Sequence, residues 1–435
     1  MSKMISITRN RINQTQRGIV PTGYMKTSLG IAPNTWRTAR LDEICKLSSG
    51  STPRRNKAEY FTGNILWVSS GELKKKYVSD THERISQVAA RESHLEMYDP
   101  GTVVAAIYGL EAAGIRGTAS IIEKRCTISQ ACLAFSDFKG VDNEFFYYWY
   151  LFNGSLIGLR YAQGTKQQNL SSEIVGTLQI CFPSIEEQRK IALILAMQDK
   201  VIELHERKIK QLAMLKKISL RKMFPRHGFN TPEVRFSGFA DAWRRRKLAD
   251  LCSISKGVGY TKSDLKVSGN PIILYGRLYT RYEMEISDVD TFADANNESV
   301  YSRGGEVLVP ASGETAEDIS IASVVKKGGV IRGGDINIIE PTPALDSTFL
   351  AISISNEPLH SDVARMAQGK SVVHLHPSDL EKATIAYPCH AEQVKISAFA
   401  RRFDRLIALH QRKCDEEKRK KKALMQLLLT GIVRV

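Results

Sequence analysis

Two stretches of the chain place mostly hydrophobic residues at alternating intervals of three and four. The positions are Leu195, Gln198, Ile202, His205, Ile209 and Leu212, and then Ala400, Phe403, Ile407, His410, Cys414 and Glu417. This spacing lines up side chains along one face of a helix and is typical of a coiled coil. We predict two long helices that pack against each other, with the remaining apolar surface available to another subunit.

The two helical stretches are copies of each other. Adding 205 to a residue number takes Gln188 to Gln393 without a gap, and takes the loop 164–170 to the loop 369–375. A match at constant offset indicates an internal duplication. The sequence therefore predicts two similar halves, each ending in a long charged helix.

The rest of each half consists of short apolar or alternating segments bounded by Gly, Pro, Asn or Ser, which is typical of strands. These segments are 64–69, 101–108, 118–122 and 130–135 in the first half, and 271–275, 306–310, 319–325 and 335–339 in the second. The predicted fold class is α+β, with two strand-rich domains joined by two long helices packed as an antiparallel coiled coil.

The expected domains follow from these boundaries. They are a flexible leader at 1–32, a first domain at 33–185, a helix at 186–227, a second domain at 228–390 and a second helix at 391–435. The leader is polar and unpatterned. A basic tail that touches DNA is the less favoured interpretation of it.

The positive charge is concentrated outside the two domains. The chain carries a net charge of +16, and the segments 186–227, 391–435 and 1–30 carry +6, +7 and +5, which leaves −2 for the remainder. A net positive charge points toward a polyanionic partner. If the domains bind nucleic acid, we expect them to do so through local patches.

The sequence lacks the common signatures of catalysis. The chain has no Gly-x-x-x-x-Gly-Lys-Ser/Thr loop, His-Glu-x-x-His helix or Gly-x-Ser-x-Gly turn. The pair His374 and His376 lacks a third ligand, and the seven cysteines are scattered without a Cys-x-x-Cys pair. We expect a soluble, cytoplasmic, non-catalytic protein with buried free thiols and no metal.

Several motifs together resemble one known family. They are the segments 36–45, 50–53 (Gly-Ser-Thr-Pro), 164–170 (Gly-Thr-Lys-Gln-Gln-Asn-Leu) and 183–191 (Pro-Ser-Ile-Glu-Glu-Gln-Arg-Lys-Ile), followed by a long basic helix. This pattern resembles the specificity subunit of Type I restriction-modification enzymes over residues 33–435. The second half departs from it where Ser255 to Tyr260 replace the Gly-Ser-Thr-Pro segment.

The resemblance implies a division of labour between subunits. Each domain would be a target recognition domain that reads one part of a split site in double-stranded DNA, and the helices would set the spacing. Two methyltransferase subunits would dock on the helices, and motor-nuclease subunits would join the complex. S-adenosylmethionine, ATP and magnesium would belong to these partners, with no cofactor in this chain.

Candidate DNA contacts are loops that combine Lys or Arg with amides, hydroxyls or aromatic rings. In the first domain they are Arg54, Arg55, Lys57, Lys74, Lys75, Lys76, Tyr77, Lys166, Gln167, Gln168 and Asn169; in the second they are Arg277, Tyr279, Arg281, Tyr282, Lys370 and His374. Candidates for the helix pair and subunit docking are Leu195, Ile202, His205, Ile209, Leu212, Phe403, Ile407 and His410. Gly164 and Gly369 are expected to shape turns.

The helix length fits a spacer between two DNA readers. A helix of roughly 38 residues is about 57 Å long, which matches about a turn and a half of duplex DNA. Two alternatives remain open at this point. One is a DNA methyltransferase that carries its own recognition domain, and the other is a coiled-coil scaffold with no sequence-specific DNA role.

Overall fold

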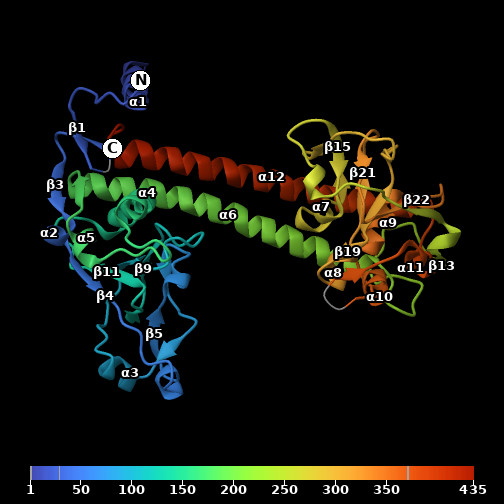
Figure 1. Ribbon diagram of the computed structural model, residues 1–435, viewed down its shortest axis with the longest axis horizontal. Coiled ribbons are helices and arrows are strands. Elements are labelled where there is room, and N and C mark those ends of the chain that lie inside the picture. The colour runs from blue at the N-terminus through green and yellow to red at the C-terminus, as the bar shows by residue number, and fades with distance from the viewer. Residues whose placement is uncertain (1, 29, 370–371) are drawn as a thin grey trace. The chain divides into compact units, whose positions relative to one another are not determined.

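The computed structural model describes residues 2–28, 30–369 and 372–435. The chain forms two compact units, one made of residues up to 205 together with 413–435 and the other of residues 206–412. Helices α6 (Ile185–Met223) and α12 (His390–Leu429) each continue from one unit into the other (Figure 1). They confirm the two long helices predicted from the heptad spacing.

Each unit also contains five shorter helices among the described residues. In the first they are α1 (Ser2–Gln16), α2 (Leu41–Ile44), α3 (Gln87–Glu92), α4 (Asn143–Tyr161) and α5 (Ser172–Gly176). In the second they are α7 (Tyr275–Thr280), α8 (Ala316–Ile319), α9 (Ser347–Ile354), α10 (Leu359–Met366) and α11 (Pro377–Lys382). An aspartate at the N-cap starts both α4 and α9, where Asp142 and Asp346 accept backbone N–H groups of the first turn.

The first unit contains a five-stranded sheet. Its order is β4 (Lys46–Ser49), β11 (Cys132–Ser136), β8 (Val103–Ala106), β9 (Ala119–Ile122) and β6 (Tyr77–Val78). Only the edge pair β6–β9 is parallel. A smaller sheet has the order β10 (Cys126–Ile128), β5 (Ile65–Val68) and β7 (Arg84–Ile85), and β3 (Arg37–Arg40) pairs with β12 (Gln179–Phe182).

The second unit repeats this topology strand for strand. The large sheet has the order β14 (Cys252–Lys256), β22 (Ile336–Pro341), β18 (Val307–Pro310), β20 (Ser323–Val325) and β16 (Glu285–Ile286), again with a parallel edge pair. The small sheet has β21 (Ile331–Arg332), β15 (Asn270–Ile273) and β17 (Phe292–Ala293), and β13 (Arg244–Lys247) pairs with β24 (Thr384–Tyr387). A further pair joins β19 (Ser312–Gly313) to β23 (Val373–His374).

All eight predicted strand segments contain a strand, and the α+β duplication is confirmed at the level of topology. The boundaries differ by one or two residues in most segments and by four in the segment 319–325, which is a strand only over Ser323–Val325 because α8 ends at Ile319. The strands were detectable because the inner ones are apolar on both faces. All four residues of β8, for example, are buried.

Both ends of the helix pair contribute to a domain core. In the first unit Leu195 of α6 and Leu428 of α12 join the cluster around Phe146 of α4. In the second unit Leu220 of α6 and Ile396 of α12 belong to one cluster with Phe349, Leu350 and Trp243. The domains are thus packed on the helices through continuous apolar cores.

Polar contacts repeat across the helix pair at the offset of the duplication. Lys421 Nζ lies 2.5 Å from Asp199 Oδ1 in the first unit, and Lys216 Nζ lies 2.5 Å from Asp404 Oδ1 in the second. Each pair joins the N-terminal half of one helix to the C-terminal half of the other. The helices therefore run antiparallel within each unit, as the predicted fold class has them.

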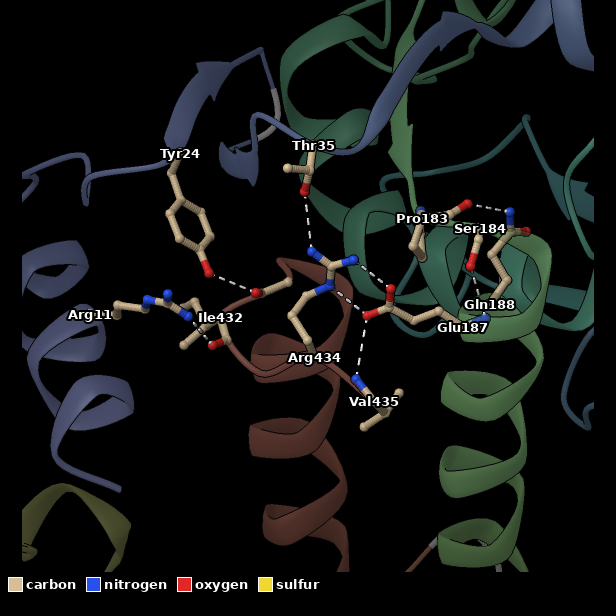
Figure 2. Close-up of polar contacts among 11 residues, drawn as sticks. Arg11, Tyr24, Thr35, Pro183, Ser184, Glu187, Gln188, Ile432, Arg434 and Val435 are labelled. Atoms are coloured by element: carbon tan, nitrogen blue, oxygen red, sulfur yellow. Dashed lines mark hydrogen bonds and ion pairs between the residues drawn. The ribbon is translucent and has the colours of Figure 1, made fainter. Parts of the chain in front are cut away.

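The start of the chain differs from the expected flexible leader. It forms α1 and an antiparallel hairpin of β1 (Tyr24–Thr27) and β2 (Gly30–Pro33). The Tyr24 hydroxyl donates to the carbonyl oxygen of Gly431 at 2.7 Å, and Arg11 Nη1 donates to that of Ile432 at 3.3 Å (Figure 2). These partners lie at the opposite end of the sequence, so the local pattern could not reveal them.

Candidate nucleic-acid interface

The first domain is fixed to the start of its helix by a buried glutamine. The Gln188 amide Nε2 donates to the carbonyl oxygens of Gly140 (3.1 Å) and Pro183 (2.9 Å). Its Oε1 accepts the backbone N–H of Asp142 at 2.8 Å. One side chain thereby connects the first turn of α6, the end of β12 and the N-cap of α4.

The second domain uses the same device. The Gln393 Nε2 donates to the carbonyl oxygens of Ala344 and Pro388, both at 3.0 Å, and Oε1 accepts the backbone N–H of Asp346 at 2.9 Å. Both glutamines are fully buried. The repeated Glu-Gln motif is therefore the joint that orients each domain on its helix.

The glutamate beside each glutamine makes a second joint. Arg434 donates through Nε and Nη2 to both Glu187 oxygens at 2.6 Å, and through Nη1 to Thr35 (Figure 2). In the second unit Arg235 donates to both Glu392 oxygens at 2.8 Å. Two parallel hydrogen bonds to one carboxylate are a strong, directional contact. Thus the segment that follows one helix holds the first turn of the other.

The predicted loop 54–57 contains three basic side chains, of which one has no ion pair among the described contacts and two contact carboxylates. Arg54 is exposed and has no side-chain partner among the described residues. Arg55 is paired with Glu83 and lies over the rings of Phe61 and Trp67. Lys57 contacts Glu92 at 3.2 Å.

The predicted loop 74–77 shows the same division. Lys74 and Lys75 are exposed without an ion pair among the described contacts. Lys76 Nζ lies 2.9 Å from Glu144 Oε2, and the Tyr77 hydroxyl donates to Glu144 Oε1 at 2.5 Å. Burial, together with this carboxylate, raises the pKa of Tyr77. Lys76 and Tyr77 therefore attach the edge strand β6 to α4. The unpaired Lys74 and Lys75 directly precede them in the sequence.

The third predicted loop, 164–169, is a closed turn. Gln163 and Asn169 form a β-bridge across it, and Gly164 has a φ of +104° that favours glycine. A Cβ on Gly164 would lie 2.1 Å from the carbonyl oxygen of Gln167. Lys166 and Gln167 are exposed at its tip, whereas Gln168 accepts from Arg116 at 2.7 Å. The expectation that Gly164 shapes a turn agrees with this geometry.

In the second domain, the structure brings three predicted residues together. Arg277 and Tyr279 lie on α7 and Arg281 follows it, and all three line one cavity. Arg277 is buried, and its Nη2 lies 2.7 Å from Glu283 Oε2, while Arg281 is paired with Asp290.

The other predicted residues of the second domain lie elsewhere. The hydroxyl of Tyr282 lies 3.4 Å from Ser355 Oγ. His374 is on β23 with Nδ1 3.0 Å from Ser312 Oγ, and Lys370 lies outside the described residues. Gly369 has a φ of +141°, as expected for a turn. The segment 256–262 lines the same cavity as α7, and no pattern in the sequence links the two segments.

The residues predicted for the helix seam are sorted by their burial. Leu195, Ile202 and Leu212 are buried, whereas His205, Ile209, Phe403, Ile407 and His410 are partly buried. A second apolar row, which was not predicted from the sequence, lies on an exposed face of α6, and we call it the outer row. It consists of Leu193, Met197, Val201 and Leu204, with exposed fractions of 60%, 59%, 38% and 63%. Its spacing of four, four and three was visible in the sequence.

Features of other functional classes are absent from the described residues. Within 2–28, 30–369 and 372–435, no group of three or more His, Cys, Asp or Glu side chains could hold a metal ion. None of the helices described there combines the length and the apolar character needed to cross a bilayer.

The fold and its joints define a two-repeat protein in which two α+β domains of the same topology are each fixed to the first turn of a long helix. Residues 33–214 and 240–417 match the family model of the Type I restriction modification DNA specificity domain. The chain belongs to this family.

Relatives of known sequence and structure agree in length. The Type I restriction enzyme MjaIX specificity subunit of Methanocaldococcus jannaschii is 22% identical over 431 residues, which cover 95% of this chain and 97% of the relative. The MjaVIII specificity subunit of the same organism is 20% identical over 418 residues, 93% of this chain and 94% of the relative. The Type I restriction-modification S subunit from M. genitalium has a TM-score of 0.53 at 15% identity, covering 93% and 99%. A chain from a study of complex assembly and conformational transition of the type I R-M system has a TM-score of 0.58 at 18% identity, covering 92% and 99%.

Proposed function

We infer that the chain is the DNA specificity subunit of a Type I restriction-modification complex, in which each domain reads one half of a two-part site. The observation that carries this conclusion is the family match, which falls once on each of two domains with the same strand order. Two different half-sites require domains that share one fold and differ in the side chains of their loops. Gln167 and Asn169 of the first domain, for example, correspond to Val372 and His374 of the second.

The free cations of the first domain are proposed to contact phosphates. Arg54, Lys74, Lys75 and Lys166 are exposed, and no ion pair holds them among the described contacts. Such side chains position a protein on the duplex, whereas base edges are read by hydrogen bonds in the grooves. The neighbouring Arg55, Lys57 and Lys76 are engaged by carboxylates, so we assign them to shaping the loops.

Catalysis is proposed to reside in partner subunits. Two methyltransferase subunits and motor-nuclease subunits would complete the complex, and S-adenosylmethionine, ATP and magnesium would be bound by them. The outer row on α6 supports a docking role for this helix, because four exposed apolar side chains in a line are unusual for a helix face that meets only water. The seam residues Leu195, Ile202 and Leu212 are then assigned to the helix pair.

Selection of bound sequences from a random DNA pool by the assembled complex tests this function. We expect a motif of two fixed parts separated by a spacer of constant length and variable sequence. A coiled-coil scaffold would enrich no motif. A methyltransferase with its own recognition domain would transfer methyl groups without partners, so methylation by the isolated chain would contradict the proposal.

A further inference from the structure

A cavity of about 1040 Å³ opens on the second domain beside α7. Its walls are formed by the segments 256–262 and 274–281 together with residues near 290 and 334. Part of this wall is the segment in which the second repeat departs from the first. The first repeat has Gly50-Ser51-Thr52-Pro53 at that place, and a 3-10 turn, Ser70–Glu72, between β5 and β6 where the second has α7.

The wall of this cavity is largely aromatic and apolar. Tyr260, Tyr275 and Tyr279 contribute rings, and Leu265 and Leu274 contribute aliphatic side chains. The ring centroids of Tyr275 and Tyr279 lie 6.2 Å apart with an interplanar angle of 53°. A wall of this composition favours a planar ligand that stacks on aromatic rings.

A buried guanidinium in the same wall has unused donors. Arg277 is only 9% exposed; its Nη2 donates to Glu283 (2.7 Å) and to the carbonyl oxygen of Asp288 (3.2 Å). Its Nε and Nη1 are buried without a hydrogen-bond partner in the described structure, and Nε lies 3.9 Å from Asp290 Oδ1. Buried donors without partners are costly, so this site favours a ligand that accepts hydrogen bonds.

The rim adds positive charge. Lys262 is exposed and has no ion pair among the described contacts, whereas Lys256 is 3.2 Å from Asp335 and Arg281 is paired with Asp290. A planar base with acceptor atoms, joined to a phosphate, matches the aromatic wall, the Arg277 donors and the free lysine together.

We propose that this cavity holds one nucleotide of the bound DNA that has been removed from the base stack, with its base against Tyr275 and Tyr279 and its acceptors facing Arg277. This proposal rests on the proposed function, because DNA is the source of the nucleotide. The second domain would then recognise its half-site partly by unstacking one base of the DNA. The first domain need not deform its own half-site in this way.

Gly276 allows the cavity to be filled with little strain. A Cβ on this residue would meet only the Tyr279 hydroxyl oxygen, at 3.7 Å, which is an ordinary contact. Gly276→Trp therefore places an indole in the cavity, and Gly276→Ala is the matched control that adds one methyl group. Alanine is also the better helix former, so the control should fold at least as well.

The test measures the affinity of the assembled complex for its motif by fluorescence anisotropy, with the base opposite each motif position removed in turn. Removing the opposite base lowers the cost of unstacking. We expect one position in the half-site of the second domain where this tightens binding roughly tenfold for wild type and Gly276→Ala, and where Gly276→Trp shows no gain. Positions unstacked by a methyltransferase partner would respond equally in all three proteins.

Three results would overturn the proposal. The first is an identical response of wild type and Gly276→Trp at every position, with equal affinity for the motif. The second is Trp-sensitive binding of a free deoxynucleoside monophosphate together with unchanged DNA binding, which would assign the cavity to a free nucleotide. The third is a wild-type complex that prefers no motif, which would overturn the proposed function itself and this proposal with it.

Discussion

Single side chains hold each domain in place. Gln188 and Gln393 are the clearest cases, because each satisfies three backbone groups that come from two separate segments of the chain. Both residues belong to the repeated motif from which the duplication was recognised. The motif therefore marks a structural joint, and we propose that DNA recognition belongs to other loops of each domain.

The glutamine joint predicts a stability loss. We expect Gln188→Met to destabilise the first unit by about 2–4 kcal/mol, because it leaves buried backbone groups without partners. Gln393→Met should affect the second unit by a similar amount, and Gln211→Met, at an exposed position of α6, should change little. Denaturant unfolding measures the effect, and equal stability of all three variants would contradict the role of the joint.

The burial of each cysteine determines how readily its thiol reacts. Burial raises the pKa of Cys45, Cys126, Cys132 and Cys252 to about 12. A thiol in the unfolded chain has a pKa of about 8.5. The contribution of these neutral thiols to the free energy of unfolding is therefore complete below about pH 8.5 and is lost as the pH rises toward 12.

This shift predicts selective alkylation. In the native chain at pH 8, iodoacetamide should modify the exposed Cys389 first and leave the four buried thiols unmodified. At pH 10 the same selectivity should persist, because the buried thiols are still protonated. Peptide mass spectrometry locates the label, and early modification of Cys126 or Cys132 would contradict the described packing.

Residue-scale site prediction from the sequence was only partly possible. Composition pointed to basic loops, but it could not distinguish the free Lys74 from Arg55, whose partner Glu83 lies 28 residues away. It also could not show that Arg277 is buried. Gly164 was predictable because a glycine within a polar loop favours a turn with positive φ.

At the level of elements, α6 carries two apolar rows, the seam and the outer row. The seam residues were predictable from their heptad spacing, and so were the inner strands from their apolar runs. The outer row on α6 has a similar spacing, but a helix with two apolar faces does not show which one meets its partner helix. Only the burial of Leu195 and the exposure of Leu193 separate them.

The outer row predicts a specific assembly defect. Met197→Arg should weaken the binding of methyltransferase subunits by roughly tenfold or more, because a charge would be buried in an apolar contact. Val88→Arg is the control, because it places an arginine at an exposed apolar position of α3, away from α6. Analytical ultracentrifugation of the mixed subunits measures assembly, and equal affinity for both variants would exclude the outer row as the docking surface.

The continuous helices also predict how the spacer can be changed. Deleting 201–207 together with 406–412 removes seven residues from each helix, about 10 Å, and preserves the heptad register. We expect the DNA spacer to shorten by about three base pairs while both half-sites stay the same. Sequencing of methylated DNA gives the spacer length, and an unchanged spacer in an assembled complex would contradict the spacer role.

At the scale of the whole molecule, the duplication was the most informative feature of the sequence. A constant offset of 205 predicted two domains of equal topology, and the sheets of the two units have the same strand order and directions. The start of the chain was misinterpreted, because Tyr24 and Gly431 are partners 407 residues apart and neither carries a local signal. Contacts of this kind depend on the completed fold.

We propose that the two domains read separate halves of one DNA site independently of each other. Exchange of residues 33–182 for the corresponding segment of another specificity subunit tests it most directly, with the methylated motif of cellular DNA as the readout. We expect one half-site to change and the other half-site and the spacer to remain. A change in both halves, or in neither, would contradict independent readers.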